Sequence, residues 1–211
     1  MYRRIPNLIT LGRLLLTGLF FLVINWPARG REFPVLMWVS LGIFILAAAS
    51  DALDGYLARI WKAESAFGRV VDPFVDKILI CGAFVFFSTP HILPPHLALP
   101  AALRRYGVTG VVPWMAVVLI AREFLVTSIR GLAESKGLDF RALWTGKLKM
   151  TIQSVAVGIV LIYLALLGEP GLIELARRVA VLRDVVIWLA ITVTVFSAGQ
   201  YIHRAWRVMD I

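Results

Sequence analysis

Long apolar runs alternate with short polar segments along the whole chain. Six of these runs approach the ~20 residues that a helix needs to cross a hydrocarbon core, with approximate limits 5–26, 34–58, 69–89, 111–134, 146–167 and 185–206. They are too continuous for the alternating pattern of barrel strands, and only helices or closed barrels span lipid. The pattern therefore predicts an all-α integral membrane protein with six transmembrane helices, in a single membrane-embedded domain over residues 1–211.

The first apolar run could be mistaken for a signal peptide, because it follows the basic start MYRR. It is too long for a typical apolar signal region, and the sequence Trp26-Pro27-Ala28-Arg29 at its end is a poor cleavage site. We therefore expect a retained first helix, with Pro6 in its first turn.

Composition and charge agree with a membrane protein. Hydrophobic residues make up 60% of the chain and charged residues only 17%, while the net charge is +9. The charges gather at the ends of the apolar runs, where anionic lipid headgroups lie, and no aromatic-basic strip suggests nucleic acid. Lys and Arg are more numerous on the side of the N-terminus. This predicts a multi-pass protein of the cell (inner) membrane with both termini in the cytoplasm.

Two further features of the sequence, a pair of histidines and a single cysteine, do not indicate a functional site. The Pro-rich segment 90–110 contains His91 and His96, which could bind a metal, but a solvated loop is the simpler interpretation. Cys81 is the only cysteine, so no disulfide can form within the chain, and its apolar surroundings indicate a small buried hydrophobic residue.

Four aspartates cluster around the second and third apolar runs. Asp51 and Asp54 are spaced i, i+3 and share a helix face, and Asp72 and Asp76 do the same at i, i+4. The short connection between the two runs predicts antiparallel neighbours, so the two pairs should face each other at one depth. We expect this to be the polar end on the cytoplasmic side.

Such a group of carboxylates needs compensation, because charges inside a bilayer are costly and repel one another. Arg59, Arg69 and Lys77 could neutralise part of the charge. Hard divalent cations would do so better, and two Mg²⁺ or Mn²⁺ ions held by carboxylates form a common site for phosphoryl displacement. A structural ion-pair network and a cation transport site are the alternatives.

The spacing Asp51-x2-Asp54-Gly55-x2-Ala58-Arg59-x8-Gly68-x3-Asp72-x3-Asp76 resembles the signature of the CDP-alcohol phosphotransferase family, and every fixed position is met. The resemblance implies that Asp51, Asp54, Asp72 and Asp76 bind two divalent metal ions, Mg²⁺ or Mn²⁺, with Asp76 also the general base. It further implies that Gly55, Ala58, Arg59 and Gly68 hold the cytidine diphosphate of the donor. Close helix packing is the alternative role for Gly55 and Ala58.

Three further segments are similar to the phosphatidylglycerophosphate synthases of bacteria: Ile5-Pro6-Asn7-Leu8-Ile9-Thr10 with Arg13, Ala121-Arg122-Glu123 leading to Arg130, and Gly146-Lys147-Leu148-Lys149-Met150-Thr151. The resemblance implies a metal-dependent phosphatidyltransferase of phospholipid biosynthesis, with CDP-diacylglycerol as donor, glycerol 3-phosphate as acceptor and CMP released. Family members are dimers, so the resemblance also implies a homodimer. Membrane lipids would surround it. Sister enzymes that use inositol phosphate or another alcohol share the aspartate motif.

An acceptor that carries a phosphate needs a cationic pocket. Arg122, Arg130, Lys147 and Lys149 are the candidates, because arginine forks match phosphate oxygens and lysine adds point charge. Alternatively, Arg122 pairs with an aspartate or Glu123, and the lysines anchor lipid headgroups. Asn7, Thr10 and Arg13 share a broad face of the first helix, where they either line the nucleotide or metal site or lie in the membrane interface.

Overall fold

The chain folds into helices that match the predicted apolar runs. Its structure, a computed structural model, describes residues 5–27, 31–61, 66–89, 108–137 and 144–209, and within these ranges contains no strand. A short 3-10 helix, η3 (Pro170–Leu172), precedes the last helix. The α-helices within the described residues are α1 (Ile5–Ile24), α2 (Glu32–Trp61), α3 (Ala66–Phe87), α5 (Pro113–Ser135), α6 (Trp144–Leu167) and α7 (Ile173–Met209). The prediction of an all-helical fold is confirmed.

The boundary of the last helix differs most from the prediction. It begins at Ile173, whereas the apolar pattern predicted a start near residue 185. The added turns carry charged side chains, among them Glu174 and Arg177, which are 73% and 77% exposed and approach to 3.8 Å as an i, i+3 pair. Hydropathy reports the part of a helix that suits lipid, so it misses turns that continue into a polar environment.

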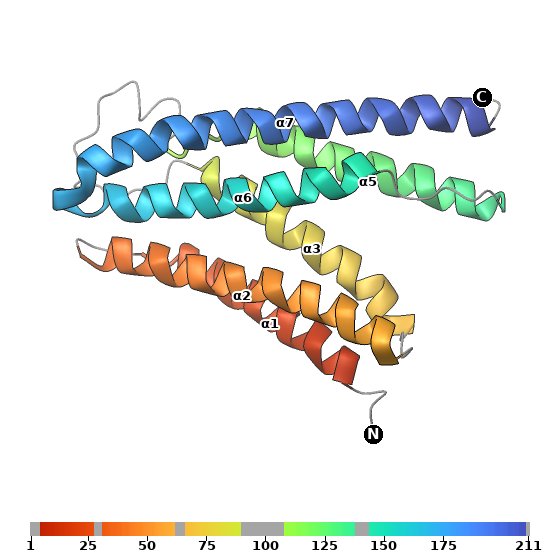
Figure 1. Cartoon of the computed structure of the whole chain (residues 1–211), viewed down its shortest axis with the longest axis horizontal. Helices are drawn as coiled ribbons and strands as arrows, with labels where there is room; N and C mark the ends of the chain where they lie inside the picture. Colours follow the sequence, from red (N-terminus) through yellow and green to blue (C-terminus); the bar gives the residue numbers. More distant parts are fainter. Residues whose placement is uncertain (1–4, 28–30, 62–65, 90–107, 138–143, 210–211) are drawn as a thin grey trace.

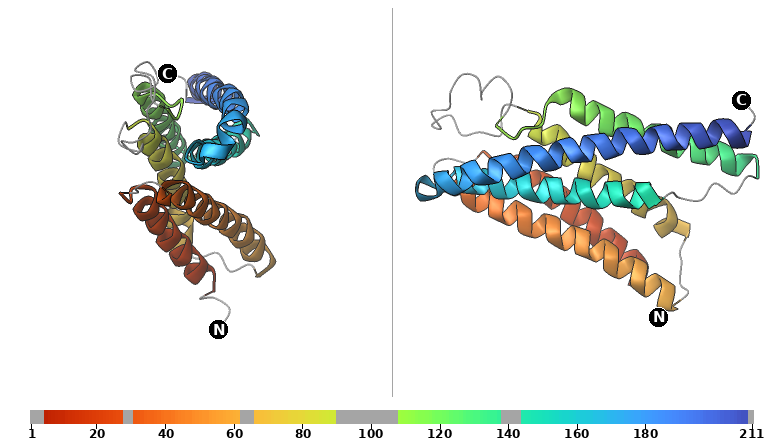
Figure 2. Two further views of the ribbon diagram at one scale, coloured as in Figure 1. Left: turned by 90° about the vertical axis from the view of Figure 1, so that its left-hand side faces the viewer. Right: turned by 45° about the horizontal axis from the view of Figure 1, so that its top comes forward.

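The helices alternate in direction, and both termini lie at the same end of the bundle (Figure 1). The pairs α1–α2 and α6–α7 pack as antiparallel hairpins, and α5 packs on α7. The yellow helix α3 crosses obliquely and contacts α1, α5 and α6 (Figures 1 and 2). As a result α2 and α3 converge where residues 62–65 link them and diverge toward their other ends, so they are neighbours only near that link.

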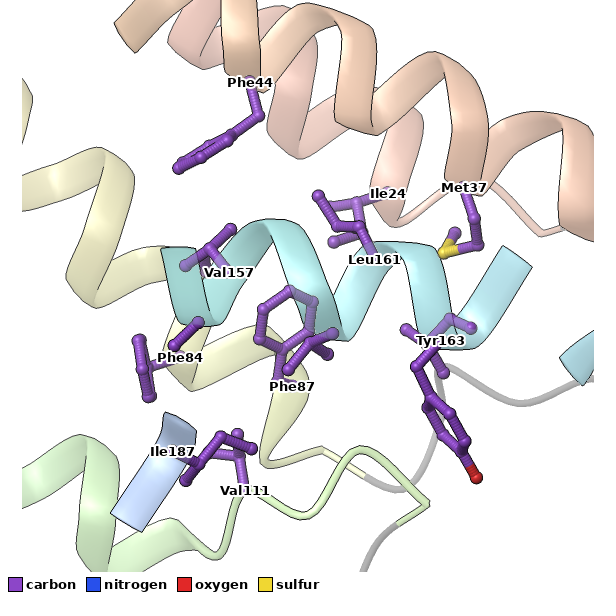
Figure 3. Packing of buried hydrophobic residues seen from close by; sticks show 14 of the residues in the cluster. Ile24, Met37, Phe44, Phe84, Phe87, Val111, Val157, Leu161, Tyr163 and Ile187 are labelled. Carbon is purple, nitrogen blue, oxygen red and sulfur yellow. The ribbon is translucent and has the colours of Figure 1, made fainter. Parts of the chain in front are cut away.

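The apolar core centres on α6. Figure 3 shows Phe44 of α2, Phe84 and Phe87 of α3, Leu161 of α6 and Ile187 of α7 converging from four helices. All of these side chains are buried. Since α6 also contacts α2, α3 and α7, its interior face joins the two hairpins into one body.

Defined caps set the limits of α5, the helix that carries the predicted Arg122 and Arg130. Pro113 occupies its first turn after the extended residue Val112, a position where the missing N–H of proline costs nothing. Gly137 follows the other end with φ +69°, the left-handed conformation that commonly stops a helix. The Pro-rich residues 90–107 before this helix, with His91 and His96, lie outside the described residues.

Large apolar side chains cover much of the outer surface, including Leu22 (68% exposed), Phe124 (70%) and Phe196 (61%). A water-soluble monomer rarely exposes continuous apolar surface on this scale. In the described part of the chain, Glu32–Ser50, Trp144–Leu167 and Ile173–Arg207 are long and apolar enough to cross a membrane. The protein is therefore membrane-embedded, and spans by the other three helices stay a prediction.

Candidate active site

A polar cavity of about 310 Å³ opens among α3, α5, α6 and α7. It lies toward the end of the bundle that holds both termini, because its lining draws on the first half of α6 and the last third of α7. The lining residues of α3 and α5 lie near the middle of those helices. Among the described residues, two carboxylates and five cationic side chains line it: Asp76, Glu123, Lys77, Arg122, Arg130, Lys147 and Lys149. Asp76 and the four cations predicted to bind a phosphate thus share one cavity.

Asp76 is oriented by an arginine of the first helix. Its Oδ1 lies 3.5 Å from Nη2 of Arg13, whose side chain is 1% exposed, against 23% for the aspartate. A buried guanidinium in an apolar bundle needs an anionic partner, and α1 packs directly on α3 at this level. Arg13 is therefore buried inside the bundle beside Asp76, and its role in a nucleotide or metal site stays a prediction.

Arg122 is held firmly inside the bundle, where its side chain is only 6% exposed. Its Nε and Nη2 donate hydrogen bonds to the hydroxyl of Ser197 at 3.1 and 2.8 Å. Its Nη1 donates to Oε1 of Glu123 at 3.2 Å, and its guanidinium lies 5.5 Å from the centre of the Tyr201 ring. Arg122 pairs with Glu123, as the alternative interpretation predicted, and also lines the cavity.

Lys149 shares the same carboxylate oxygen. Its ammonium donates to Oε1 of Glu123, and its side chain is 4% exposed. Burying an unpaired ammonium at this depth would cost about 2.5–3.5 kcal/mol, so Glu123 makes the position of Lys149 tolerable. Lys149 lies inside the protein and does not serve as a headgroup anchor at the surface.

The remaining cations surround the inner ones. Arg130 and Lys147 are exposed and line the cavity from α5 and α6. Lys77 donates to the hydroxyl of Thr127 at 2.5 Å, which in turn donates to the backbone carbonyl of Glu123 at 2.7 Å. The inner part of the cavity is therefore lined by buried cations with fixed partners, and its outer part by exposed cations.

The other predicted residues are placed only by their helices. Asp51, Asp54, Gly55, Ala58 and Arg59 are on α2, Gly68 and Asp72 on α3, and Asn7 and Thr10 on α1. Their side chains lie outside the described residues. Among the side chains that are described, no three acidic, histidine or cysteine groups are arranged to hold a metal ion. The predicted metal set thus stays a prediction, with Asp76 as its one described member.

Sequence reasoning missed the contribution of the last helix. Ser197 and Tyr201 contact Arg122, and Thr194 accepts a hydrogen bond at 2.9 Å from Gln153, which lines the cavity. Thr194, Ser197 and Tyr201 recur at i, i+3 and i+7 along α7. That polar stripe was a readable signal, because a helix places such positions on one face toward its neighbours.

A larger apolar groove of about 680 Å³ adjoins the polar cavity between α1, α3 and α5. Phe21, Phe74 and Phe124 are among its lining residues. Lys77, Cys81, Glu123 and Thr127 line both spaces, so the groove is continuous with the polar cavity at that end.

Comparison with known proteins decides the family. Residues 3–196 match the CDP-alcohol phosphatidyltransferase family over most of the chain. The chain belongs to this family. Three similar relatives are all named CDP-diacylglycerol--glycerol-3-phosphate 3-phosphatidyltransferase. The one from Bacillus subtilis is 27% identical, with 97% of this chain and 96% of the relative covered. The one from Yersinia enterocolitica is 31% identical, with 98% and 97% covered.

The third of these relatives, from Cereibacter sphaeroides, is 34% identical over 74% of this chain and 62% of its own length. Membership of the CDP-alcohol phosphatidyltransferase family makes the chain a phosphatidyltransferase and confirms the resemblance drawn from the aspartate motif. Within that family, the cavity holding Asp76 is the candidate active site.

Proposed function

We propose that the protein transfers the phosphatidyl group of CDP-diacylglycerol to glycerol 3-phosphate, producing phosphatidylglycerophosphate and CMP. One observation carries the choice of acceptor: a single cavity holds Asp76 together with Arg122, Arg130, Lys147 and Lys149. The names of the similar relatives support the same reaction. A cation transport site is not favoured, because cationic groups outnumber carboxylates in the described lining.

The cationic groups would bind the phosphate of the acceptor. Arg122 is fixed by Ser197 and Tyr201, so its guanidinium loses little freedom when an anion arrives. Arg130 and Lys147, being exposed, would attract the anion and complete its coordination. The volume of about 310 Å³ lies at the small end of the range for ligand pockets. It suits a small phosphorylated alcohol, whereas the larger donor must extend outside.

Asp76 would act on the other end of the acceptor. The attacking hydroxyl forms a bond to the phosphorus that bears diacylglycerol, and the bond from this phosphorus to the CMP oxygen breaks. The hydroxyl proton passes to the carboxylate of Asp76, which Arg13 keeps oriented toward the cavity. Holding the alcohol between Asp76 and the cations supplies the proximity on which the rate depends.

The motif residues suit divalent metal ions, because carboxylate oxygens are the ligands that Mg²⁺ and Mn²⁺ prefer. Asp76, whose side chain lines the cavity, would be one ligand, with Asp51, Asp54 and Asp72 as the others. Bound ions would stabilise negative charge on the diphosphate and on the departing CMP. By the same resemblance, Gly55, Ala58, Arg59, Gly68, Asn7 and Thr10 would hold the cytidine diphosphate.

The apolar groove offers the donor lipid a place beside the cavity. Its lining is mostly aromatic and aliphatic, and it meets the polar cavity at Lys77 and Glu123. A lipid whose acyl chain lay there would bring its headgroup to the level of Asp76. We also propose that this end of the bundle faces the cytoplasm. A homodimer remains a prediction.

An acceptor screen tests the proposed reaction. Purified protein in mixed micelles with CDP-diacylglycerol is given glycerol 3-phosphate, inositol phosphate, phosphatidylglycerol or serine, and CMP release is measured. We expect release with glycerol 3-phosphate alone. Release with inositol phosphate but not with glycerol 3-phosphate would overturn the choice of acceptor.

A further inference from the structure

One carboxylate stands among the cations that are proposed to bind a phosphate. Glu123 lines the polar cavity and its side chain is 13% exposed, so its charge faces the space where an anion would bind. A carboxylate weakens anion binding by direct repulsion, which a site for phosphate alone would avoid. Pairing of its Oε1 with Arg122 and Lys149 explains the burial of those cations. What points to a second group on the ligand is its other oxygen.

The two oxygens of Glu123 have different surroundings. Both described contacts, from Arg122 and from Lys149, go to Oε1. Within the side chains that the structure describes, Oε2 makes no hydrogen bond or ion pair. An ionised carboxylate can only accept hydrogen bonds, so the group that meets Oε2 must be a donor such as a hydroxyl.

The position of this oxygen locates the hydroxyl on the ligand. Glu123 contacts two of the cations proposed for the phosphate, whereas Asp76 serves the reacting end of the acceptor. A hydroxyl near Glu123 therefore lies close to the phosphate and is not the one that reacts. In glycerol 3-phosphate the hydroxyl on the middle carbon, next to the carbon that bears the phosphate, meets both conditions.

We propose that Glu123 binds the non-reacting hydroxyl of the acceptor and so selects phosphorylated polyols over phosphorylated simple alcohols. The inference rests on the proposed function. It gives Glu123 two roles, with Oε1 holding Arg122 and Lys149 in place and Oε2 accepting a hydrogen bond from that hydroxyl. A site that hydrogen-bonds a substrate hydroxyl discriminates strongly against an analogue that lacks it, because a polar group is then left unpaired.

The experiment compares two acceptors in two proteins. One acceptor is glycerol 3-phosphate, and the other is 3-hydroxypropyl phosphate, which has the same length without the middle hydroxyl. In the wild type we expect kcat/KM for CMP release to fall at least ~10-fold when the hydroxyl is absent. In Glu123→Gln the fall should shrink below about 3-fold, because the amide turns its oxygen to Lys149 and presents NH₂ in place of Oε2.

Ser197→Ala is the matched control. It removes a partner of Arg122 but leaves Glu123 intact, so it should raise KM for both acceptors and preserve the wild-type ratio between them. Should Glu123→Gln fail to accumulate, Glu123→Asp withdraws both oxygens by one methylene and should reduce the ratio in the same way.

Three outcomes are decisive. A ratio that collapses in the Glu123 variant but not in Ser197→Ala supports the inference. Equal ratios in wild type and the Glu123 variant overturn it and leave Glu123 a positioning residue for Lys149, while the proposed function stands. Absence of CMP release from the wild type with glycerol 3-phosphate overturns the proposed function and this inference together.

Discussion

Asp76 is the described residue on which the proposed chemistry depends most directly. It is half-buried, contacts Arg13 and faces the cations across a small cavity. Asp76→Asn keeps the shape of the side chain but removes its charge and its ability to accept a proton. We expect kcat to fall by about 10²–10⁴, the usual contribution of a general base. Steady-state CMP release, with the thermal unfolding temperature as a check on folding, measures the effect.

Asp184→Asn provides the matched control. Asp184 also pairs with an arginine, Arg183, at 2.7 Å, but it is 52% exposed and belongs to the first third of α7, far along the helix from the cavity residue Tyr201. Activity should stay within about twofold of the wild type, because partly exposed surface changes rarely cost more than ~0.5 kcal/mol. Near-normal turnover in Asp76→Asn would contradict the role of that carboxylate.

Metal removal tests the same site in another way. If Asp51, Asp54, Asp72 and Asp76 hold divalent ions, EDTA should abolish CMP release, and added Mg²⁺ or Mn²⁺ should restore it. Zn²⁺ favours nitrogen and sulfur ligands, so it should restore activity poorly. Full activity in EDTA, after dialysis against a chelating resin, would contradict the metal proposal.

At the scale of elements, the contact between α1 and α3 sets the distance between Arg13 and Asp76. Gly82 of α3 lies against Phe21 of α1: a Cβ at Gly82 would approach Cζ of that ring to 2.3 Å. Phe21 also stacks on Phe86, with ring centres 5.4 Å apart, so the ring cannot shift without losing that contact. The glycine therefore lets the two helices approach closely.

Gly82→Ala should force these helices apart. Overpacking of this kind costs about 1–3 kcal/mol, which corresponds to a fall of roughly 2–10 °C in the thermal unfolding temperature. Gly18→Ala on α1 is the control, because no atom lies within 4 Å of the added Cβ and stability should change little. Equal unfolding temperatures for the two variants would contradict the close α1–α3 contact.

The elements also show how far sequence reasoning reaches. Apolar runs locate the α-helices of the described residues, because a helix that crosses lipid needs a continuous apolar composition. The start of α7 at Ile173 escaped prediction, since its charged turns satisfy helix geometry without suiting lipid. The neighbours of α3 escaped it as well. A short connection brings α2 and α3 together at one end, but packing on α1, α5 and α6 decides where α3 goes afterwards.

At the scale of the whole molecule, the sequence predicted which cations line the cavity but not which residues hold them in place. Residue type and depth identified Arg122, Arg130, Lys147 and Lys149, and the fold places them in one cavity. Their fixed partners depend on the crossing of α5, α6 and α7, which no local pattern encodes. Ser197 and Tyr201 are far from Arg122 in the sequence and meet it only because α7 packs on α5.

The length of α7 gives the molecule two distinguishable ends. Its 37 residues extend about 55 Å at 1.5 Å per residue, well beyond a hydrocarbon core of ~30 Å. Arg177 near the start of α7 and Arg207 near its end are both exposed. The cavity and both chain termini lie toward the end of the bundle at which α7 ends. The proposed orientation, with that end in the cytoplasm, can therefore be tested at two positions of one helix.

Single cysteines at these two positions, each in a Cys81→Ala background, report the orientation. A membrane-impermeant maleimide added to right-side-out vesicles should label Arg177→Cys at once and Arg207→Cys only after permeabilisation. The reason is the excess of Lys and Arg at the end that carries the cavity, which favours retention on the cytoplasmic side. CMP release by both variants verifies that the fold is intact. The reverse labelling pattern would place the cavity on the outer face, away from a cytoplasmic supply of a charged acceptor.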